Sequence, residues 1–275
     1  MTNLLITGVS GGLGRAFAVA ALYAGHTVAG TVRGEADAAA FTRLHPERAH
    51  ARLLDVTDDD AVLAVVAGVE KEIGPVDVLI ANAGYGLEGT FEETPLSALR
   101  AQFDVNVFGA AATIQAVLPF MRERRRGHIL AVSSMGGLAG FPGVSAYCAS
   151  KYALEGLLES LGPEIAGFGI HVTAVEPGSF RTEWAGRSMV RAPRTIADYD
   201  EVFDPIRAGR RRASGNQLGD PARAAAAVLR VIREPRPPRH LVLGSDALRV
   251  VRAGRAAVDD DLSRWEELTL STDFA

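Results

Sequence analysis

The sequence has few of the residues that cross-link a chain, anchor it in a membrane or attach it to nucleic acid. Its single cysteine, Cys148, cannot form an internal disulfide. Its N-terminus lacks the charged start and apolar run of a signal peptide, and no apolar stretch approaches the roughly 20 residues of a membrane span. The net charge of -4 gives no basic field for nucleic acid or an anionic bilayer. We therefore expect a cytoplasmic protein that binds neither nucleic acid nor membrane.

Lysine is also scarce, and its positions are informative. The 29 basic residues include only two lysines, Lys71 and Lys151, and all others are arginine. A lysine in such a chain marks a place where a compact ammonium serves better than a planar guanidinium.

Short apolar runs alternate with longer segments of helical periodicity along the chain. The expected strands are Leu4–Thr7, Thr27–Thr31, Ala51–Leu54, Val76–Ala81, His128–Ser133, His171–Glu176 and His240–Leu243. The helical patterns include Leu13–Tyr23, Asp58–Glu72, Leu96–Arg122 and Ala146–Ile165. This alternation predicts an α/β fold, a Rossmann-type doubly wound parallel sheet of seven strands with helices on both faces. We expect one domain over 1–245, followed by a helix at 247–257 and an acidic tail from Asp259.

The segment 178–219 mixes glycine, proline, arginine and aromatic residues without clean periodicity. A connection of this length in a compact fold is usually functional or mobile, so we expect a substrate loop. Its large apolar side chains either cover a hydrophobic ligand or pack the loop onto the domain: Phe180, Trp184, Met189, Tyr199 and Phe203. Its arginines Arg207 and Arg210–Arg212 either meet an acidic substrate or a second phosphate, or lie in solvent.

A glycine-rich turn follows the first expected strand and opens the first expected helix. Glycines let the backbone approach a pyrophosphate closely, and the free N–H groups at a helix N-terminus favour its negative charge. By itself the pattern is also compatible with an ordinary strand-to-helix turn. The residues of the turn that we expect to contact a dinucleotide are Thr7, Gly8, Ser10, Gly12, Leu13 and Gly14.

The end of the second expected strand indicates which dinucleotide binds. NAD sites usually carry an acidic residue there for the ribose 2'-hydroxyl. This chain has Arg33 instead, which can pair with a 2'-phosphate, so we expect NADP(H) to be preferred over NAD(H). The alternative is that Arg33 is a solvated loop charge.

Tyr147 and Lys151 are four residues apart in a helical pattern, so their side chains lie on one face. An ammonium next to a phenol favours the phenolate and lowers the pKa of the phenol from about 10. Tyr147 would then exchange a proton with a carbonyl or alcohol oxygen. The alternative is that Tyr147 and Lys151 form an ordinary pair on a helix surface. Ser134, thirteen residues before Tyr147, makes this alternative the weaker one.

Together these motifs resemble the short-chain dehydrogenase/reductase family, from about Asn3 to Leu243. The resemblance implies that Tyr147 is the catalytic acid or base, that Ser134 orients the substrate oxygen and that Lys151 binds the nicotinamide ribose. Asn106 resembles the asparagine that holds a water next to the lysine. The layout is also similar to hydroxysteroid and retinol dehydrogenases. The matching motifs are Thr7-Gly8, Gly12, Gly14, Asn82-Ala83-Gly84, Asn106, Ser134, Tyr147 and Lys151.

The resemblance implies further cofactor contacts. They are made by Asp55 and Val56 at the adenine, by Asn82, Ala83 and Gly84 at a strand end, and by Pro177, Gly178 and Thr182 at the carboxamide. The sequence departs from the family at Gly11, where a basic residue or serine is usual.

The expected activity is hydride transfer between NADP(H) and a carbonyl or alcohol substrate that is partly hydrophobic, without a metal. A non-catalytic NADP(H)-binding sensor or scaffold and a nucleotide-sugar epimerase are the alternatives. The resemblance also implies a homodimer or homotetramer, paired through the helices at 96–122 and 146–165.

Overall fold

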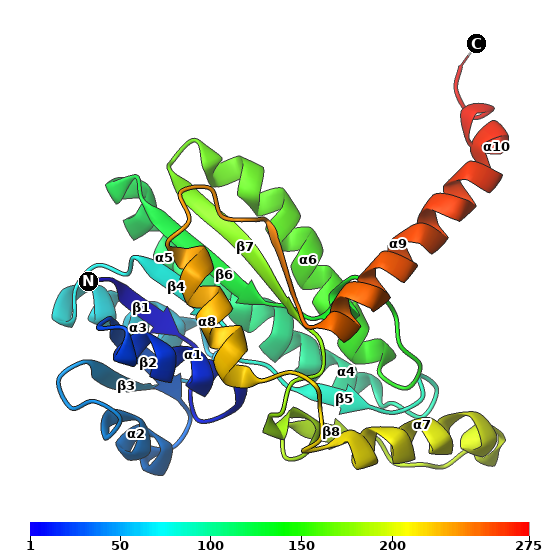
Figure 1. The fold of residues 1–275 in the computed structure, drawn as a ribbon, viewed down its shortest axis with the longest axis horizontal. Helices are drawn as coiled ribbons and strands as arrows, with labels where there is room; N and C mark the ends of the chain where they lie inside the picture. The colour runs from blue at the N-terminus through cyan, green and yellow to red at the C-terminus, as the bar shows by residue number, and fades with distance from the viewer. Residues whose placement is uncertain (275) are drawn as a thin grey trace.

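A computed structural model describes residues 1–274 and shows one parallel sheet of seven strands (Figure 1). The strands follow the order β3-β2-β1-β4-β6-β7-β9. Their bounds are β1 Asn3–Ile6, β2 Thr27–Val32, β3 Ala49–Leu53, β4 Val78–Ala81, β6 Gly127–Val132, β7 Ile170–Pro177 and β9 His240–Leu243. The chain order reverses between β1 and β4, and in open α/β sheets a ligand binds at the strand ends beside such a reversal. The predicted fold class is confirmed.

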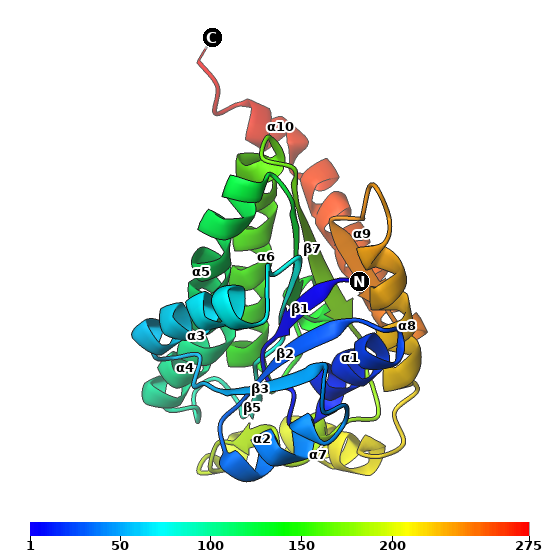
Figure 2. The ribbon, with the colours of Figure 1, turned by 90° about the vertical axis from the view of Figure 1, so that its left-hand side faces the viewer.

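Helices cover both faces of the sheet, and each face has its own apolar core (Figure 2). One face carries α1 (Gly12–Tyr23), α2 (Glu35–Thr42) and α8 (Pro221–Ile232). The other carries α3 (Asp59–Glu72), α5 (Gly109–Arg124) and α6 (Ser145–Ala166). The helices α2 and α8 were not among the expected elements. At α8 the start signal is plain, since Asp220 caps the helix and Pro221 opens it.

The expected helix at 96–122 is confirmed as a continuous run with a wider turn inside it. It consists of α4 (Leu96–Phe103), the π-helix η1 (Asp104–Phe108) and α5. By length and composition Leu96–Arg124 could cross a membrane. Its side chains Ile114, Val117 and Met121 are almost fully buried in the core, however, as in the central helix of a soluble fold.

The segment 178–219 is more ordered than the sequence suggested. It contains the 3-10 helices η3 (Glu183–Ala185) and η4 (Ala197–Tyr199), the strand β8 (Met189–Arg191) and the helix α7 (Asp200–Ala213). β8 pairs with β5 (Gly86–Glu88) in a small second sheet. The expectation of an irregular loop was wrong for α7, because its polar surface and Pro205 obscure the helical pattern.

The expected C-terminal helix at 247–257 is present but longer, and it includes the start of the acidic segment. The helix α9 spans Ser245–Arg264 and α10 spans Glu266–Leu270. Alanine, leucine and arginine favour helix along α9, and three aspartates in a row lower that preference too little to end it. Figure 1 shows α9 leaving the body of the molecule, with α10 at its far end.

Candidate functional site

A cleft of about 790 Å³ opens at the carboxyl ends of the strands, next to the reversal between β1 and β4. Sixteen of the predicted site residues line it: Gly8, Ser10, Gly12, Leu13, Arg33, Asp55, Val56, Asn82, Ala83, Gly84, Ser134, Tyr147, Lys151, Pro177, Gly178 and Thr182. Thr7, Gly14 and Asn106 are not part of its lining. Residues from seven separate stretches of sequence therefore meet in one place.

The glycine-rich turn is fixed from behind by Thr7 and Asn82. The hydroxyl of Thr7 accepts hydrogen bonds from the backbone N–H groups of Asn82 and Ala83, both at 2.9 Å. In return, the Asn82 amide donates to the carbonyl oxygens of Thr7 and Gly8. A Cβ on Gly14 would collide with the Gly8 carbonyl oxygen and the Asn82 amide, so this close packing requires glycine.

The start of α1 is well suited to hold a phosphate. Gly11 at its N-cap has no side chain to cap the helix, and the first turn contains no acidic residue. The first N–H groups of the helix are therefore free to bind an anion. Gly12 has a φ of 58°, in the left-handed region that favours glycine.

Tyr147 lies on α6 next to Ser134, which follows the end of β6. Tyr147 is only 8% exposed, and its ring centre lies 5.1 Å from that of Trp184. The Ser134 hydroxyl accepts a hydrogen bond from the N–H of Gly136 at 3.0 Å. A Cβ on Gly136 would lie 3.3 Å from the Tyr147 ring and 3.4 Å from the Ser134 hydroxyl, so a glycine brings the two side chains together.

Lys151 lies one turn after Tyr147 and is 5% exposed. Its Nζ donates to the carbonyl oxygen of Val132 at 2.8 Å and lies 5.9 Å from the centre of the Tyr147 ring. Burial lowers the pKa of Lys151 to about 8, and the nearby Glu155 carboxylate opposes this shift.

The expected effect of Lys151 on Tyr147 needs correction. Burial raises the pKa of Tyr147 to about 12, and the Ser134 hydroxyl opposes this only in part. No hydrogen bond within residues 1–274 joins Lys151 to the phenol, and its ammonium donates to the Val132 carbonyl instead. At neutral pH Tyr147 is therefore a protonated phenol.

Asn106 lies in the π-helix η1 and is 1% exposed. Its Oδ1 accepts from the N–H of Tyr85 at 3.0 Å, and its amide donates to the Tyr85 carbonyl and the Ser150 hydroxyl. A Cβ on Gly84 would lie 3.0 Å from the Asn106 oxygen and 3.6 Å from Lys151 Nζ. Asn106 thus positions the turn after β4 beside Lys151.

Two further residues of the cofactor side escaped the sequence reasoning. Asp246, in the first turn of α9, accepts a hydrogen bond from the N–H of Ser179 at 2.8 Å and packs against Gly178. Arg187 lines the cleft, and its guanidinium would lie 2.5 Å from a Cβ on Gly11. A basic residue or serine at position 11, which the family usually has, would therefore displace Arg187.

The arginines of α7 anchor the segment 178–219 to the body. Glu88 is 1% exposed, and its carboxylate lies 3.2 Å from Arg207, 3.6 Å from Arg191 and 3.9 Å from Arg210. Arg210 also donates to the Pro142 carbonyl at 2.5 Å. The two interpretations offered for Arg207 and Arg210 were both incomplete, because a glutamate far away in sequence engages them.

The large apolar side chains of 178–219 divide into two groups. Phe180, Trp184 and Met189 line the cleft, together with Phe141 and Val144. The other two hold the segment in place: Phe203 is buried under the Arg194 guanidinium, and Tyr199 donates to Glu92. The packing interpretation therefore holds for Phe203 and Tyr199, and a role of the three cleft residues in covering a ligand stays a prediction.

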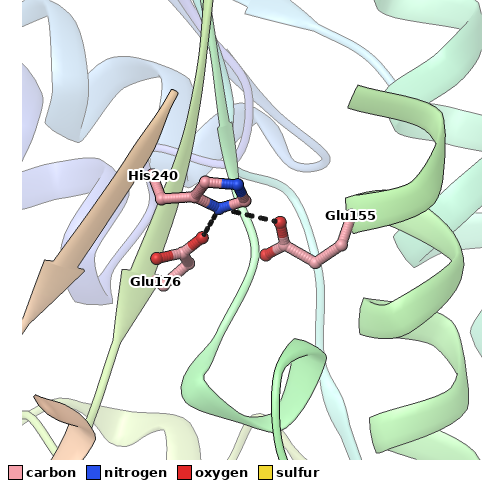
Figure 3. Close-up of side chains that lie close together, drawn as sticks. All are labelled: Glu155, Glu176 and His240. Atoms are coloured by element: carbon pink, nitrogen blue, oxygen red, sulfur yellow. Dashed lines mark hydrogen bonds and ion pairs between the residues drawn. The ribbon is translucent and has the colours of Figure 1, made fainter. Parts of the chain in front are cut away.

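A cluster of two glutamates and a histidine joins α6, β7 and β9: Glu155, Glu176 and His240 (Figure 3). Glu155 is 4% and Glu176 0% exposed, and His240 Nδ1 lies 2.6 Å from Glu176 and 3.8 Å from Glu155. Burial raises the pKa of Glu155 to about 7, with the Ser133 hydroxyl opposing, and it also raises the pKa of Glu176. These are ligand types that zinc accepts. The distance from His240 to Glu176 is that of a hydrogen bond, so we interpret the cluster as a shared-proton network.

We expect Glu155→Gln to raise the thermal unfolding temperature at about pH 8.5 and to change it little at about pH 5. The pKa of Glu155 rises from 4.5 to about 7 on folding, so in that interval the folded chain holds a proton that the unfolded chain releases. The stability of the folded chain therefore falls as pH rises from 4.5 to about 7, and it stays lower above pH 7. Glutamine carries no such proton. Circular dichroism melts at both pH values measure the difference.

The matched control is Glu159→Gln, since Glu159 also lies near His240, at 3.5 Å, but is 61% exposed. Its replacement should change the melting temperature little at either pH. An equal shift for Glu155→Gln at both pH values would contradict the assigned titration.

Comparison with known proteins agrees with this geometry. Residues 2–190 match the family model described as short chain dehydrogenase. Oxidoreductase BOA17 of Botryotinia fuckeliana is 37% identical over 99% of this chain and 100% of its own, and retinol dehydrogenase 8 of Bos taurus is 36% identical over 86% and 79%. The crystal structure of a short-chain dehydrogenase from Streptomyces avermitilis superposes with a TM-score of 0.92, at 41% identity and with 99% and 98% of the chains covered.

Solved neighbours include complexes with NAD and with NADP. The family match covers the glycine-rich turn, Ser134, Tyr147 and Lys151, which the structure brings into one cleft. This chain belongs to the short-chain dehydrogenase/reductase family and is an NAD(P)-dependent oxidoreductase.

Proposed function

We propose that this protein uses NADPH to reduce the carbonyl group of a partly hydrophobic small molecule, with Tyr147 as the proton donor. The observation that carries this is the buried phenol, placed next to the Ser134 hydroxyl at the floor of the cleft and one helical turn from Lys151. When bound, the nicotinamide supplies the hydride.

Tyr147 can supply the proton that reduction requires. Its phenol carries a proton at neutral pH and can give it to the substrate oxygen as negative charge develops there. The Ser134 hydroxyl donates a hydrogen bond to the same oxygen and fixes its position. Lys151 and Asn106 hold the cofactor side of the site, where the lysine ammonium favours the phenolate once the proton has left.

Two arginines support the preference for NADP(H). Arg33 lines the cleft directly after β2, where NAD sites usually carry an acidic residue, and Asp37 and Asp55 also line the cleft. Arg187 lies over Gly11, where other family members often carry a basic residue or serine. The missing side chain at Gly11 leaves room for a guanidinium from the segment 178–219, so that segment would help to bind the cofactor phosphates.

We expect Arg33→Met to raise the KM for NADPH by about 10-fold to 100-fold, the effect of losing a charge-assisted hydrogen bond to phosphate. The KM for NADH should stay the same, because a 2'-hydroxyl offers no charge to pair with. Initial rates with both cofactors and one substrate measure the two constants. Arg187→Met shows which phosphate Arg187 contacts. A higher KM for NADPH alone indicates the 2'-phosphate, and an equal rise in the KM for NADH indicates the pyrophosphate. An unchanged NADPH KM for Arg33→Met contradicts the assignment.

The lining of the cleft supports an apolar substrate. Phe141, Val144, Trp184 and Met189 surround the space in front of Tyr147, and the relative from Bos taurus is named as a retinol dehydrogenase. We test the proposed function by following NADPH oxidation with apolar ketones and aldehydes, with NADH as the control. Tight NADPH binding without turnover across the panel would contradict it and favour a sensor.

The alternatives gain nothing from the site. A sensor has no need of Ser134 and Tyr147, which are both present and adjacent. An epimerase of the extended type also uses a tyrosine and lysine pair, and the NADPH oxidation panel separates it from a reductase. We also propose a cytoplasmic location, which suits an unpaired and buried Cys148.

A further inference from the structure

The C-terminal helix α9 is attached to the body only by its first turns. Ala247 is fully buried and Val251 is 6% exposed, and Gly254 packs against Ala139 of the loop after η2 (Met135–Gly137). From 255 to 274, every residue is exposed. Figures 1 and 2 both show this part as an arm that points away from the sheet.

An arm of this kind is poorly stabilised by itself. Isolated helices shorter than about 12–15 residues are marginal in water, and the part of α9 beyond Gly254 is shorter than that. It nevertheless exposes large apolar side chains: Val258 is 58%, Leu262 61% and Trp265 52% exposed. A partner that covers Leu262 would stabilise the arm.

One face of α9 is complementary to itself. Leu248, Arg252, Asp259 and Leu262 follow one another at spacings of four, seven and three residues, which puts them on one side of a helix. Leu248 is 43% exposed, and Arg252 and Asp259 are exposed too. Within residues 1–274, neither of these charges forms a salt bridge. Read from either end, the order is leucine, charge, opposite charge, leucine.

We propose that this face binds the same face of a second copy of the chain, with the two α9 helices antiparallel about a two-fold axis near Arg255. In this register Leu248 of each copy meets Leu262 of the other, and Arg252 meets Asp259, each pair occurring twice as two-fold symmetry demands. The helices that the family resemblance implied for pairing, α5 and α6, form a different surface.

The charges along α9 favour the antiparallel direction. Arg249, Arg252 and Arg255 come before Asp259–Asp261 along the helix, and at its two ends Asp246 and Arg264 carry opposite charges. Parallel helices would place like charges opposite one another, whereas antiparallel helices place arginines beside aspartates. The aspartates also speak against a membrane as the partner, since interfacial helices carry basic residues beside the apolar face.

Charge reversal tests the pairing. Arg252→Asp and Asp259→Arg should each weaken self-association at least about tenfold in sedimentation velocity, because like charges then face each other. The double variant Arg252→Asp/Asp259→Arg should restore it, since the swapped charges again meet their opposites in the partner. Within one chain the two positions lie about 10 Å apart along the helix, so the rescue reports contact between copies.

Matched controls are Arg249→Asp and Asp260→Arg, which make the same charge changes about 100° around α9 from this face. These controls should leave self-association unchanged. If the chains paired through another surface instead, the control variants and the Arg252 and Asp259 variants would have the same effect. In addition, Leu248→Cys/Leu262→Cys should form a cross-linked dimer on oxidation, and the single variants should not. Cys148 is buried and adds little background.

The proposal is overturned if the single reversals leave association intact, if the double variant is no better than the singles, or if no cross-link forms. Flotation with neutral phosphatidylcholine vesicles that depends on Leu262 would identify a membrane as the occupant instead and would also overturn it. Turnover by each variant, measured separately, distinguishes these outcomes from failure of the proposed reductase activity.

Discussion

Tyr147→Phe is expected to lower kcat by about 10²-fold to 10⁴-fold, the range for loss of a positioned general acid. The phenylalanine ring keeps the packing against Trp184, 5.1 Å away between ring centres, and removes only the hydroxyl. The affinity for NADPH should therefore remain close to that of the wild type. A loss confined to kcat is the result expected of an interaction made only as the substrate oxygen gains charge.

Single-turnover reduction measured by stopped flow gives the rate of the chemical step, and quenching of protein fluorescence gives NADPH binding. Tyr152→Phe is the matched control: it lies on the same helix five residues later, but its side chain is 47% exposed. Its kcat should equal that of the wild type. A Tyr147→Phe enzyme with more than about a tenth of wild-type kcat would exclude the phenol as the proton donor.

Site residues that belong to a short local pattern could be identified from the sequence. The strand that ends at Thr7, the turn up to Gly14 and the helical pair Tyr147 and Lys151 each follow a short pattern, and the structure places them as expected. The seven strands were predictable for the same reason, because burial on both faces produces a continuous apolar run. Boundaries were within a few residues.

Contacts between distant segments could not be found in this way. Glu88 meets Arg207 across more than a hundred residues, and His240 meets Glu176 across 64. Nothing in the local sequence around Glu88 distinguishes a buried ion-pair partner from a solvated glutamate. Arg187 is similar, since its place over Gly11 depends on how the segment 178–219 folds back over the cleft.

The error about Tyr147 has a physical origin. Spacing alone shows that an ammonium is near the phenol, which lowers the pKa, but it does not show burial, which raises it. In the structure burial is the larger effect, and the lysine ammonium is held by the Val132 carbonyl. The same tyrosine therefore remains the candidate, while the expected form changes from phenolate to phenol.

Lys151→Met is expected to lower kcat/KM by about 10²-fold or more, because it removes both a hydrogen-bond donor to the cofactor ribose and the charge that stabilises the phenolate. Methionine nearly matches the lysine stem in length, so the buried site stays filled. The pH profile provides a second readout. Burial lowers the pKa of Lys151 to about 8, so wild-type activity should fall as pH rises through 8 and the ammonium loses its proton.

The variant should lack this alkaline decline, since it has no ammonium to titrate. Lys71→Met is the control: it replaces the only other lysine, which is exposed on α3, and should leave both rate and profile unchanged. Kinetics from about pH 6 to pH 10 with NADPH and one accepted ketone measure both effects. If Lys151→Met keeps the alkaline decline, another group titrates there; if it keeps wild-type kcat/KM, the lysine takes no part in the reaction, and the site would have to work with Tyr147 and Ser134 alone.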